Sequence, residues 1–257
     1  MKRLYLSTLV LTALALSASA PAALFFNEIM LNPPGGDNGL EFIELRSTIP
    51  NFDMSGLHLL ILEGDGTSGI RGTIDQALPL TGFSTGSNGL FLWRDSSVVL
   101  SPPPAPATTI RVQDFVPDIE NGGNTLLIVS GFTGFVGQDL DADNDDLLDF
   151  FPWTSVLDGF GYSEDLPNAL SATYALQLGL PFFPQQEWTP DAFARVGNAL
   201  YAFDVLGNNP GPYVMDPLEA YPAYLPDFYL TPGSENIPEP ASLLLIALVG
   251  LTLRRRG

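Results

Sequence analysis

The amino-acid sequence predicts an all-β fold, and three observations support this prediction. Between residues 24 and 230, short apolar runs of four to eight residues alternate with clusters of Gly, Pro, Asn and Asp. Between the two termini, no window of twelve or more residues keeps the 3.6-residue apolar period of an amphipathic helix. The chain contains no internal repeat, which argues against a propeller or a β-helix. Many short strands separated by turn residues indicate an antiparallel sandwich or barrel.

Seven apolar runs are expected to form strands because they are rich in Leu, Ile, Val and Phe and end at turn residues. In chain order they are Leu24–Met30, Leu40–Arg46, Leu57–Glu63, Gly89–Trp93, Thr109–Val112, Thr125–Ser130 and Val156–Tyr162. The prolines of Ser101–Pro106 predict an extended surface connector outside the sheets. A short helical turn is expected at Asp191–Val196, after Pro190, and an irregular, packed wrap over residues 197–236.

The N-terminus has the layout of a secretory signal peptide, predicted over residues 1–22. Met1-Lys2-Arg3 is a basic start, a mostly apolar run follows to Leu16, and small residues continue to Ala23. The apolar run is too short to be retained as a membrane-spanning helix. Cleavage is expected after Ala20 or Ala22, so the sequence predicts an exported protein.

The C-terminus, residues 237–257, combines a polar triplet, an apolar run and a basic end. Pro238-Glu239-Pro240 precedes the run from Ala241 to Leu253, and Arg254-Arg255-Arg256 follows it. As a helix, this run would reach only about 20 Å, which is short of the ~30 Å hydrocarbon core. Arginines after such a segment stay on the cytoplasmic side of the membrane, so the rest of the chain would lie outside.

These three parts, in this order, resemble a PEP-CTERM sorting signal. The resemblance implies an exported protein of a Gram-negative, exopolysaccharide-making bacterium, anchored transiently in the inner membrane and processed by an exosortase. It also implies delivery to the cell surface or the extracellular matrix. An ordinary tail anchor is the alternative, although it would not need the Pro238-Glu239-Pro240 triplet.

The charge balance excludes several classes of function. The chain has 257 residues, 29 acidic and 10 basic side chains, one His and no Cys. A formal charge of −19 disfavours a nucleic-acid-binding surface, and the absence of Cys excludes disulfides, thiolate metal sites and thiol catalysis. Half of the basic residues lie in the two terminal segments. Residues 23–236 therefore hold five arginines, no lysine and 28 acidic residues, a formal charge of −23.

Several segments of residues 23–236 resemble a lamin-tail domain. The opening segments are Phe26-Asn27-Glu28-Ile29, Glu41–Leu45 and Asp53–Leu57; the later ones are Val156–Tyr162 and Thr231–Asn236. The resemblance implies an immunoglobulin-like β-sandwich that acts as a binding or structural module, with no catalytic residues to carry over. Such a sandwich needs only about 100 residues. Long insertions are therefore expected at 64–88, 101–120 and 132–155.

The acidic run from Asp139 to Asp149 predicts a calcium site, because alternating carboxylates can surround one hard cation. Read from Asp141, the run resembles an EF-hand- or dockerin-like calcium loop. This resemblance implies side-chain ligands at Asp141, Asp143 and Asp145, a backbone carbonyl at Leu147, and a direct or water-mediated ligand at Asp149. Asp146 stands where the turn glycine is expected, Pro152 stands at the twelfth position instead of Glu, and Asp139 could supply the missing oxygen. The alternative is a solvated acidic loop.

Other candidate sites have simpler interpretations. Glu41 and Glu44 are three apart on one strand and should point to opposite faces, although Glu28 could approach one of them across strands. We expect these three carboxylates to be ordinary polar positions at strand ends rather than a glycosidase pair. His58 has no Gly-x-Ser-x-Gly partner motif and is expected to be a strand histidine. Core packing is also expected for the aromatic residues that could instead stack on sugars: Trp93, Trp153, Trp188, Phe182 and Phe183.

Together these features predict a non-enzymatic, calcium-stabilised structural or adhesive module of the cell surface or extracellular matrix. Its expected partners are an exosortase-type processing enzyme and, in the matrix, exopolysaccharide or other surface proteins. The alternative is a secreted, calcium-dependent hydrolase that acts on polysaccharide or phosphoester through carboxylates.

Overall fold

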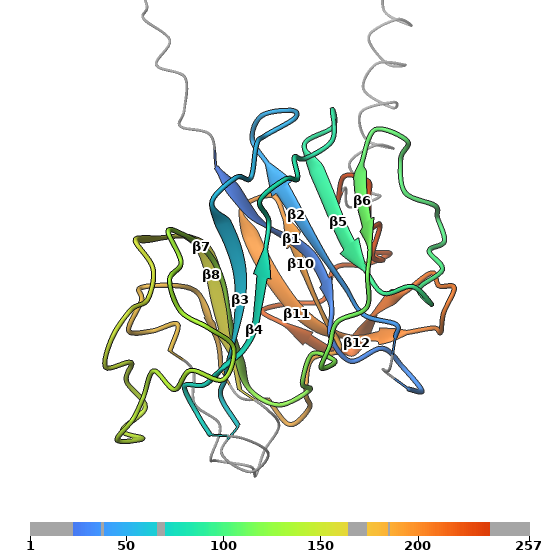
Figure 1. Ribbon diagram of the computed structural model, residues 1–257. Helices are drawn as coiled ribbons and strands as arrows, with labels where there is room; N and C mark the ends of the chain where they lie inside the picture. Colours follow the sequence, from blue (N-terminus) through green and yellow to red (C-terminus); the bar gives the residue numbers. More distant parts are fainter. Residues whose placement is uncertain (1–22, 37–38, 66–69, 164–173, 185, 237–257) are drawn as a thin grey trace, which may run out of the picture.

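A computed structural model describes residues 23–36, 39–65, 70–163, 174–184 and 186–236 (Figure 1). Two β-sheets and their connecting loops make up this part of the chain, and no helix occurs among these residues. The all-β prediction is therefore confirmed. The segments expected to form a signal helix and a C-terminal membrane helix lie outside the described residues. In the part of the chain that is described, no helix has the length and apolar character needed to span a bilayer.

Twelve strands form in the described residues. They are β1 (Leu24–Met30), β2 (Phe42–Ser47), β3 (Leu57–Glu63), β4 (Ile74–Pro79), β5 (Leu90–Arg94), β6 (Thr109–Val112), β7 (Asn124–Ser130), β8 (Ser155–Tyr162), β9 (Phe182–Phe183), β10 (Ala192–Val196), β11 (Ala199–Leu206) and β12 (Val214–Tyr221). All seven predicted strands are present, and three of them, β1, β3 and β6, have the predicted bounds.

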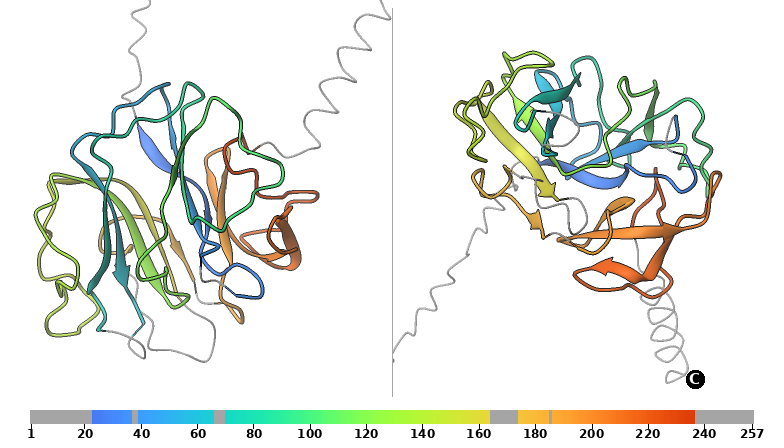
Figure 2. Two further views of the ribbon diagram at one scale, coloured as in Figure 1. Left: turned by 45° about the vertical axis from the view of Figure 1, so that its right-hand side comes forward. Right: turned by 90° about the horizontal axis from the view of Figure 1, so that it is seen from below.

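The strands form two sheets that lie face to face (Figures 1 and 2). One sheet has seven strands in the order β12-β11-β10-β1-β2-β5-β6, and the other has five in the order β4-β3-β7-β8-β9. Among the strands that the structure describes, only the edge pairs β5–β6 and β8–β9 are parallel. The proline-rich segment Ser101–Pro106 belongs to the crossover between β5 and its parallel neighbour β6, outside both sheets, as predicted.

Three apolar layers follow from the alternation of side chains along the strands. The central layer lies between the sheets and includes Phe26, Leu59 and Phe160. A second layer on the outer face of the seven-stranded sheet packs beneath the segment that contains Tyr213 and Phe228. A third layer covers the outer face of the five-stranded sheet. There, Leu140 and Leu148 of the long loop between β7 and β8 join Tyr174 and residues of β3 and β7.

Two expectations for the C-terminal third are wrong. Asp191–Val196 does not form a helical turn, because β10 pairs with β1 on one side and β11 on the other. The Asp191 carboxylate accepts the N–H of Val205, 3.1 Å away, and thereby joins the start of β10 to β11. Residues 197–236 are not simply an irregular wrap, because β11 and β12 extend the seven-stranded sheet. The expected insertion at 64–88 likewise contains a strand, β4.

Candidate metal-binding loop and buried carboxylates

The acidic loop lies between β7 and β8, and the structure brings three of its predicted ligands together. One carboxylate oxygen each from Asp141, Asp143 and Asp149 lies within 4.8 Å of the other two. Asp139 and Asp145 are not part of this group. The Asp139 carboxylate accepts a hydrogen bond from the N–H of Asp141, and the Asp145 carboxylate accepts one from the N–H of Leu147. The donor–acceptor distance is 3.0 Å in both bonds. The Leu147 side chain itself is half exposed.

Asp141 fixes the loop to the body of the protein. It is fully buried, and its carboxylate accepts the N–H groups of Asp145 and Asp146 and, over 2.9 Å, the hydroxyl of Tyr174. Gly72 packs directly against it: a Cβ at Gly72 would lie 2.6 Å from the Cβ of Asp141. The Asp149 carboxylate accepts the N–H of Ala142, which closes the loop on itself. The backbone that carries the three carboxylates is therefore fixed by contacts with Tyr174 and Gly72 and by a hydrogen bond within the loop itself.

Asp146 stands where the resemblance expects a turn glycine, and its backbone has the conformation that such a glycine would adopt. Its φ of 70° lies in the left-handed region, which Asp tolerates better than most residues. Its carboxylate forms a 2.5 Å ion pair with Arg71, a half-buried side chain of the loop that precedes β4. Asp146 is thus paired with a cation, and the three grouped carboxylates are a separate set.

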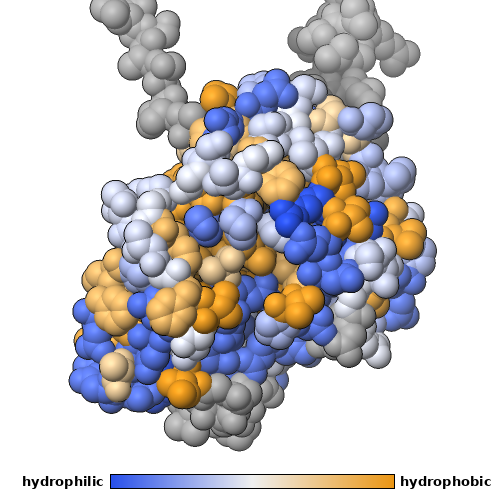
Figure 3. Space-filling model, viewed as in Figure 1, coloured by the Kyte–Doolittle hydropathy of each residue, from blue (hydrophilic) through white to orange (hydrophobic). Residues whose placement is uncertain are grey.

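The loop that carries this group also exposes apolar side chains. The exposed residues are Phe135, Val136, Leu147, Phe150 and Phe151. In Figure 3, apolar and hydrophilic surface alternates over the lower left of the molecule, where Figure 1 shows this loop. The loop between β7 and β8 therefore has apolar side chains on its outer surface as well as in its contact with the sheet.

Glu28 and Glu44 are not the ordinary strand-end positions that the sequence suggested. They are directly opposite each other on β1 and β2, and both are fully buried. Glu28 accepts the N–H of Thr231 over 2.9 Å, and Glu44 accepts the N–H of Gly233 and the side-chain amide of Asn27. Burial raises the pKa of Glu44 to about 8. Burial and the neighbouring Glu44 raise the pKa of Glu28 well above its ordinary value.

These contacts give the Glu28–Glu44 pair a structural role. The two carboxylates hold the closing segment, Thr231–Asn236, against the outer face of the seven-stranded sheet. Glu41 directly precedes β2 and points to the opposite face from Glu44, as the spacing predicted. It too is fully buried, and it accepts the N–H of Ile119 over 3.0 Å.

The structure also contains a second group of carboxylates that the sequence did not predict. Glu63, Asp75 and Glu120 each offer one oxygen, and the three oxygens lie within 4.8 Å of one another. Burial, a hydrogen bond to Glu120 and the charges of Glu120 and Asp75 raise the pKa of Glu63 to about 9. Burial and the charge of Glu120 raise the pKa of Asp75 to about 6. The residues come from three separate segments, so only the strand register, and no local spacing, could have revealed them.

The other single-residue predictions have mixed outcomes. Trp93 is buried and stacks on Phe115, which confirms the core position predicted for it. Trp153 and Trp188 are only partly buried. His58 is a half-buried strand residue, as expected: its ring lies 5.1 Å from that of Phe132, and burial lowers its pKa.

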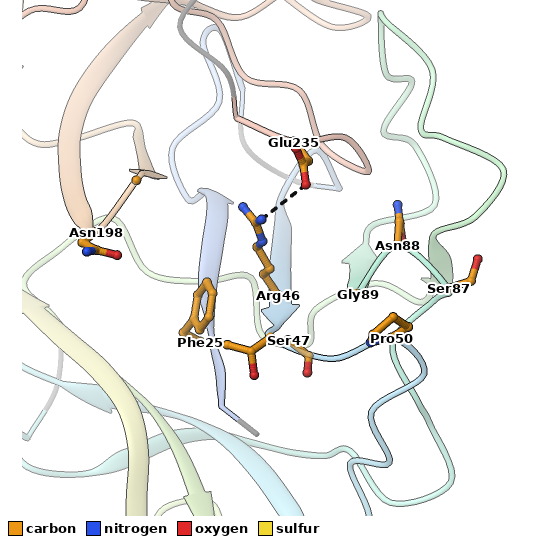
Figure 4. A pocket seen from close by; sticks show the side chains of 11 residues that line it. Phe25, Arg46, Ser47, Pro50, Ser87, Asn88, Gly89, Asn198 and Glu235 are labelled. Atoms are coloured by element: carbon orange, nitrogen blue, oxygen red, sulfur yellow. Dashed lines mark hydrogen bonds and ion pairs between the residues drawn. The ribbon is translucent and has the colours of Figure 1, made fainter. Parts of the chain in front are cut away.

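A cavity of about 510 Å³ opens at the end of the sandwich where β1 begins and β2 ends (Figure 4). Arg46 and Glu235 form a 3.3 Å ion pair on its wall. Neutral polar side chains and one aromatic ring line much of the remainder, including Ser87, Asn88, Asn198 and Phe25. The Arg46–Glu235 pair therefore supplies the charged side chains of the cavity wall, and the rest of the lining is neutral.

No family model, curated protein or solved structure matches this chain. The residues of the predicted sorting signal, Pro238, Glu239, Pro240, Arg254, Arg255 and Arg256, lie outside the described residues.

Proposed function

We propose that this chain is an exported structural or binding module in which calcium stabilises the loop at 139–149. The observation that carries the proposal is the convergence of Asp141, Asp143 and Asp149 on a loop anchored by Tyr174. Asp141 and Asp149 each follow a buried leucine, Leu140 and Leu148 respectively, on the outer face of the five-stranded sheet. A cation shared by Asp141 and Asp149 would therefore tie both ends of the loop to the sheet.

The proposal also covers the type of β-sandwich and the cellular location of the protein. The two facing sheets support an immunoglobulin-like sandwich of the lamin-tail type. The residue pattern at 237–257 supports processing by an exosortase-type enzyme after a transient stay in the inner membrane. The module would then act at the surface or in the extracellular matrix of a Gram-negative bacterium. Extracellular calcium sites need only millimolar-range affinity, which suits this destination.

Calcium titration of the full-length chain tests the proposal. With calcium at ten to a hundred times its Kd, we expect a stabilisation of roughly 1–3 kcal/mol, which raises the Tm by about 3–10 °C. Asp141→Asn combined with Asp143→Asn should make this shift smaller, because the loop no longer contributes to it. Asp227→Asn is a control for the loss of one carboxylate, because Asp227 is an exposed aspartate at a remote turn. An equal shift in the double variant and in the control would refute the calcium loop.

Exopolysaccharide is the partner we propose for the cavity at the Arg46 end. The cavity offers neutral hydroxyl and amide groups beside the ring of Phe25. Such groups can bind the hydroxyl groups of a sugar without opposite charges on the two partners. A glycan array probed with and without calcium identifies the ligand. The double variant Ser87→Ala with Asn198→Ala, two exposed residues of the cavity, should lose most binding. Ser97→Ala with Asn208→Ala makes the same chemical change outside the cavity and should bind as the natural chain does.

The alternative is a secreted, calcium-dependent hydrolase of polysaccharide or phosphoester. Its catalytic carboxylates would have to come from the acidic groups described above. Turnover by the purified chain on exopolysaccharide or nucleic acid, abolished by Asp141→Asn or by Glu63→Gln, would establish this alternative. Binding without turnover under the same conditions supports the module.

A further inference from the structure

Three polar side chains lie on one rung at the end of the five-stranded sheet. Glu63 ends β3, Asn124 begins β7 and Tyr162 ends β8, and the register pairs Asn124 with both of the others. Directly paired residues of antiparallel strands project from the same face. Tyr162 belongs to the central apolar layer, so all three side chains point between the two sheets.

Two further carboxylates meet Glu63 at this rung. In the β3–β4 pairing, Ile61 faces Gln76 and Leu62 faces Ile74, so Asp75 is the additional residue of a bulge. Glu120 lies on the segment that precedes β7. One oxygen from each of Glu63, Asp75 and Glu120 lies within 4.8 Å of the others, and Glu63 is only 3% exposed. Three acidic groups in so small a volume repel one another unless protons or a cation neutralise them.

Asn124 supplies an independent observation. It is fully buried, and its side-chain nitrogen donates to the backbone carbonyls of Glu120, over 2.8 Å, and Gly122, over 3.0 Å. Because carbonyl oxygens only accept, this nitrogen cannot be exchanged with the amide oxygen. The oxygen, Oδ1, is buried and accepts no hydrogen bond. Asn124 is the cross-strand partner of Glu63, so the side chain with this unused acceptor lies next to the side chain of Glu63.

We propose that Glu63, Asp75, Glu120 and the Oδ1 atom of Asn124 form a second cation site, selective for calcium. Carboxylate and amide oxygens are hard ligands, which suit Ca²⁺, and the set contains no nitrogen or sulfur donor to favour zinc. Oxygens up to 4.8 Å apart fit around one ion with Ca–O distances of 2.3–2.6 Å. The ion would join β3, β4 and β7 at this end of the sheet and would satisfy the buried amide oxygen.

Isothermal titration on the full-length chain separates this site from the loop site. The chain carrying Asp141→Asn and Asp143→Asn should still bind one calcium, whether or not the loop of the natural chain binds another. Adding Asp75→Asn to that background should weaken the remaining binding at least tenfold. Glu120→Gln is an independent second variant if Asp75→Asn fails to fold, and Asp227→Asn is the charge-matched control. Far-UV circular dichroism checks the fold of each variant.

Two results would overturn the proposal. The first is a folded Asp141→Asn/Asp143→Asn chain that binds no calcium. The second is remaining binding that neither Asp75→Asn nor Glu120→Gln weakens. Magnesium chloride titrated in place of calcium should bind at least tenfold more weakly, because Mg²⁺ demands near-octahedral geometry and sheds its waters reluctantly. Equal or tighter magnesium binding would refute the assignment to calcium.

Discussion

Two pairs of glutamates in the described part of the chain have different surroundings. Glu28 and Glu44 lie beneath the closing segment, where backbone N–H groups of Thr231 and Gly233 point at their carboxylates. Glu63 and Glu120 instead face each other and Asp75, and Glu63 lies next to Asn124, whose amide oxygen accepts no hydrogen bond. In the first pair, both carboxylates accept backbone N–H groups of the closing segment. In the second group, Glu63 accepts the backbone N–H of Asp65, but three carboxylates with oxygens within 4.8 Å still repel one another unless protons or a cation neutralise them.

The largest expected effect is at the Glu28–Glu44 pair. Glu44→Ala leaves the N–H of Gly233 and the side-chain amide of Asn27 without their acceptor in a buried site. We expect the free energy of unfolding to fall by roughly 3–5 kcal/mol, from two unsatisfied donors and a cavity. Glu44→Gln keeps one acceptor oxygen and should cost only about 1–2 kcal/mol. Urea unfolding measures both values, and equal losses would show that shape, not hydrogen bonding, matters at this position.

The pH dependence of stability distinguishes the two regions. Glu44 and Glu63 have folded-state pKa values of about 8 and about 9, whereas in the unfolded chain both titrate near 4.5. As the pH rises from 5 to 8, the unfolded chain releases these protons and the folded chain keeps them. Stability must therefore fall with rising pH, by roughly 1.4 kcal/mol per pH unit for each group and about 2–3 kcal/mol for the two together, or about 4–10 °C in Tm.

Thermal melts at pH 5, 6, 7 and 8 in EGTA measure this slope. Saturating calcium should reduce the part due to Glu63, because an ion favours its charged form, and leave the part due to Glu44. Glu44→Gln should do the opposite. A slope that calcium leaves unchanged would mean that Glu63 stays protonated and binds no ion.

The smallest expected effect is at Thr231. Its N–H is the main donor to Glu28, while its hydroxyl makes a weaker 3.3 Å contact with the same carboxylate. Thr231→Val keeps the N–H and removes only the hydroxyl. We expect a loss of about 0.5–1 kcal/mol in urea unfolding. A loss near that of Glu44→Ala would show that the side chain, not the backbone, holds the closing segment.

Sequence reasoning succeeded where the signal was local. The runs at β1, β3 and β6 are bounded by turn residues, so their bounds could be read directly. It failed at β10, where Asp191 after Pro190 looks like a helix start but joins β10 to β11 through the N–H of Val205. Pairing with distant strands decided that segment, and such pairing leaves no local pattern.

The same limit explains what was found at the candidate sites. Asp141, Asp143 and Asp149 lie in one loop, so their spacing was sufficient to predict that they meet. The spacing did not distinguish them from Asp139 and Asp145, whose carboxylates bind nearby N–H groups instead. The group around Glu63 depends on a bulge in β4 and on the register of β3 with β7, which no composition or spacing reveals.

The two ends of the described chain give the domain a direction. Ala23 exchanges hydrogen bonds with Thr48, and Glu235 pairs with Arg46, so both ends are fixed at the cavity end of the sandwich. The end of β3 and the acidic loop lie toward the opposite end, in the lower part of Figure 1. A tether joined to either end of this domain would therefore hold the cavity close to the point of attachment and leave the acidic loop on the far side.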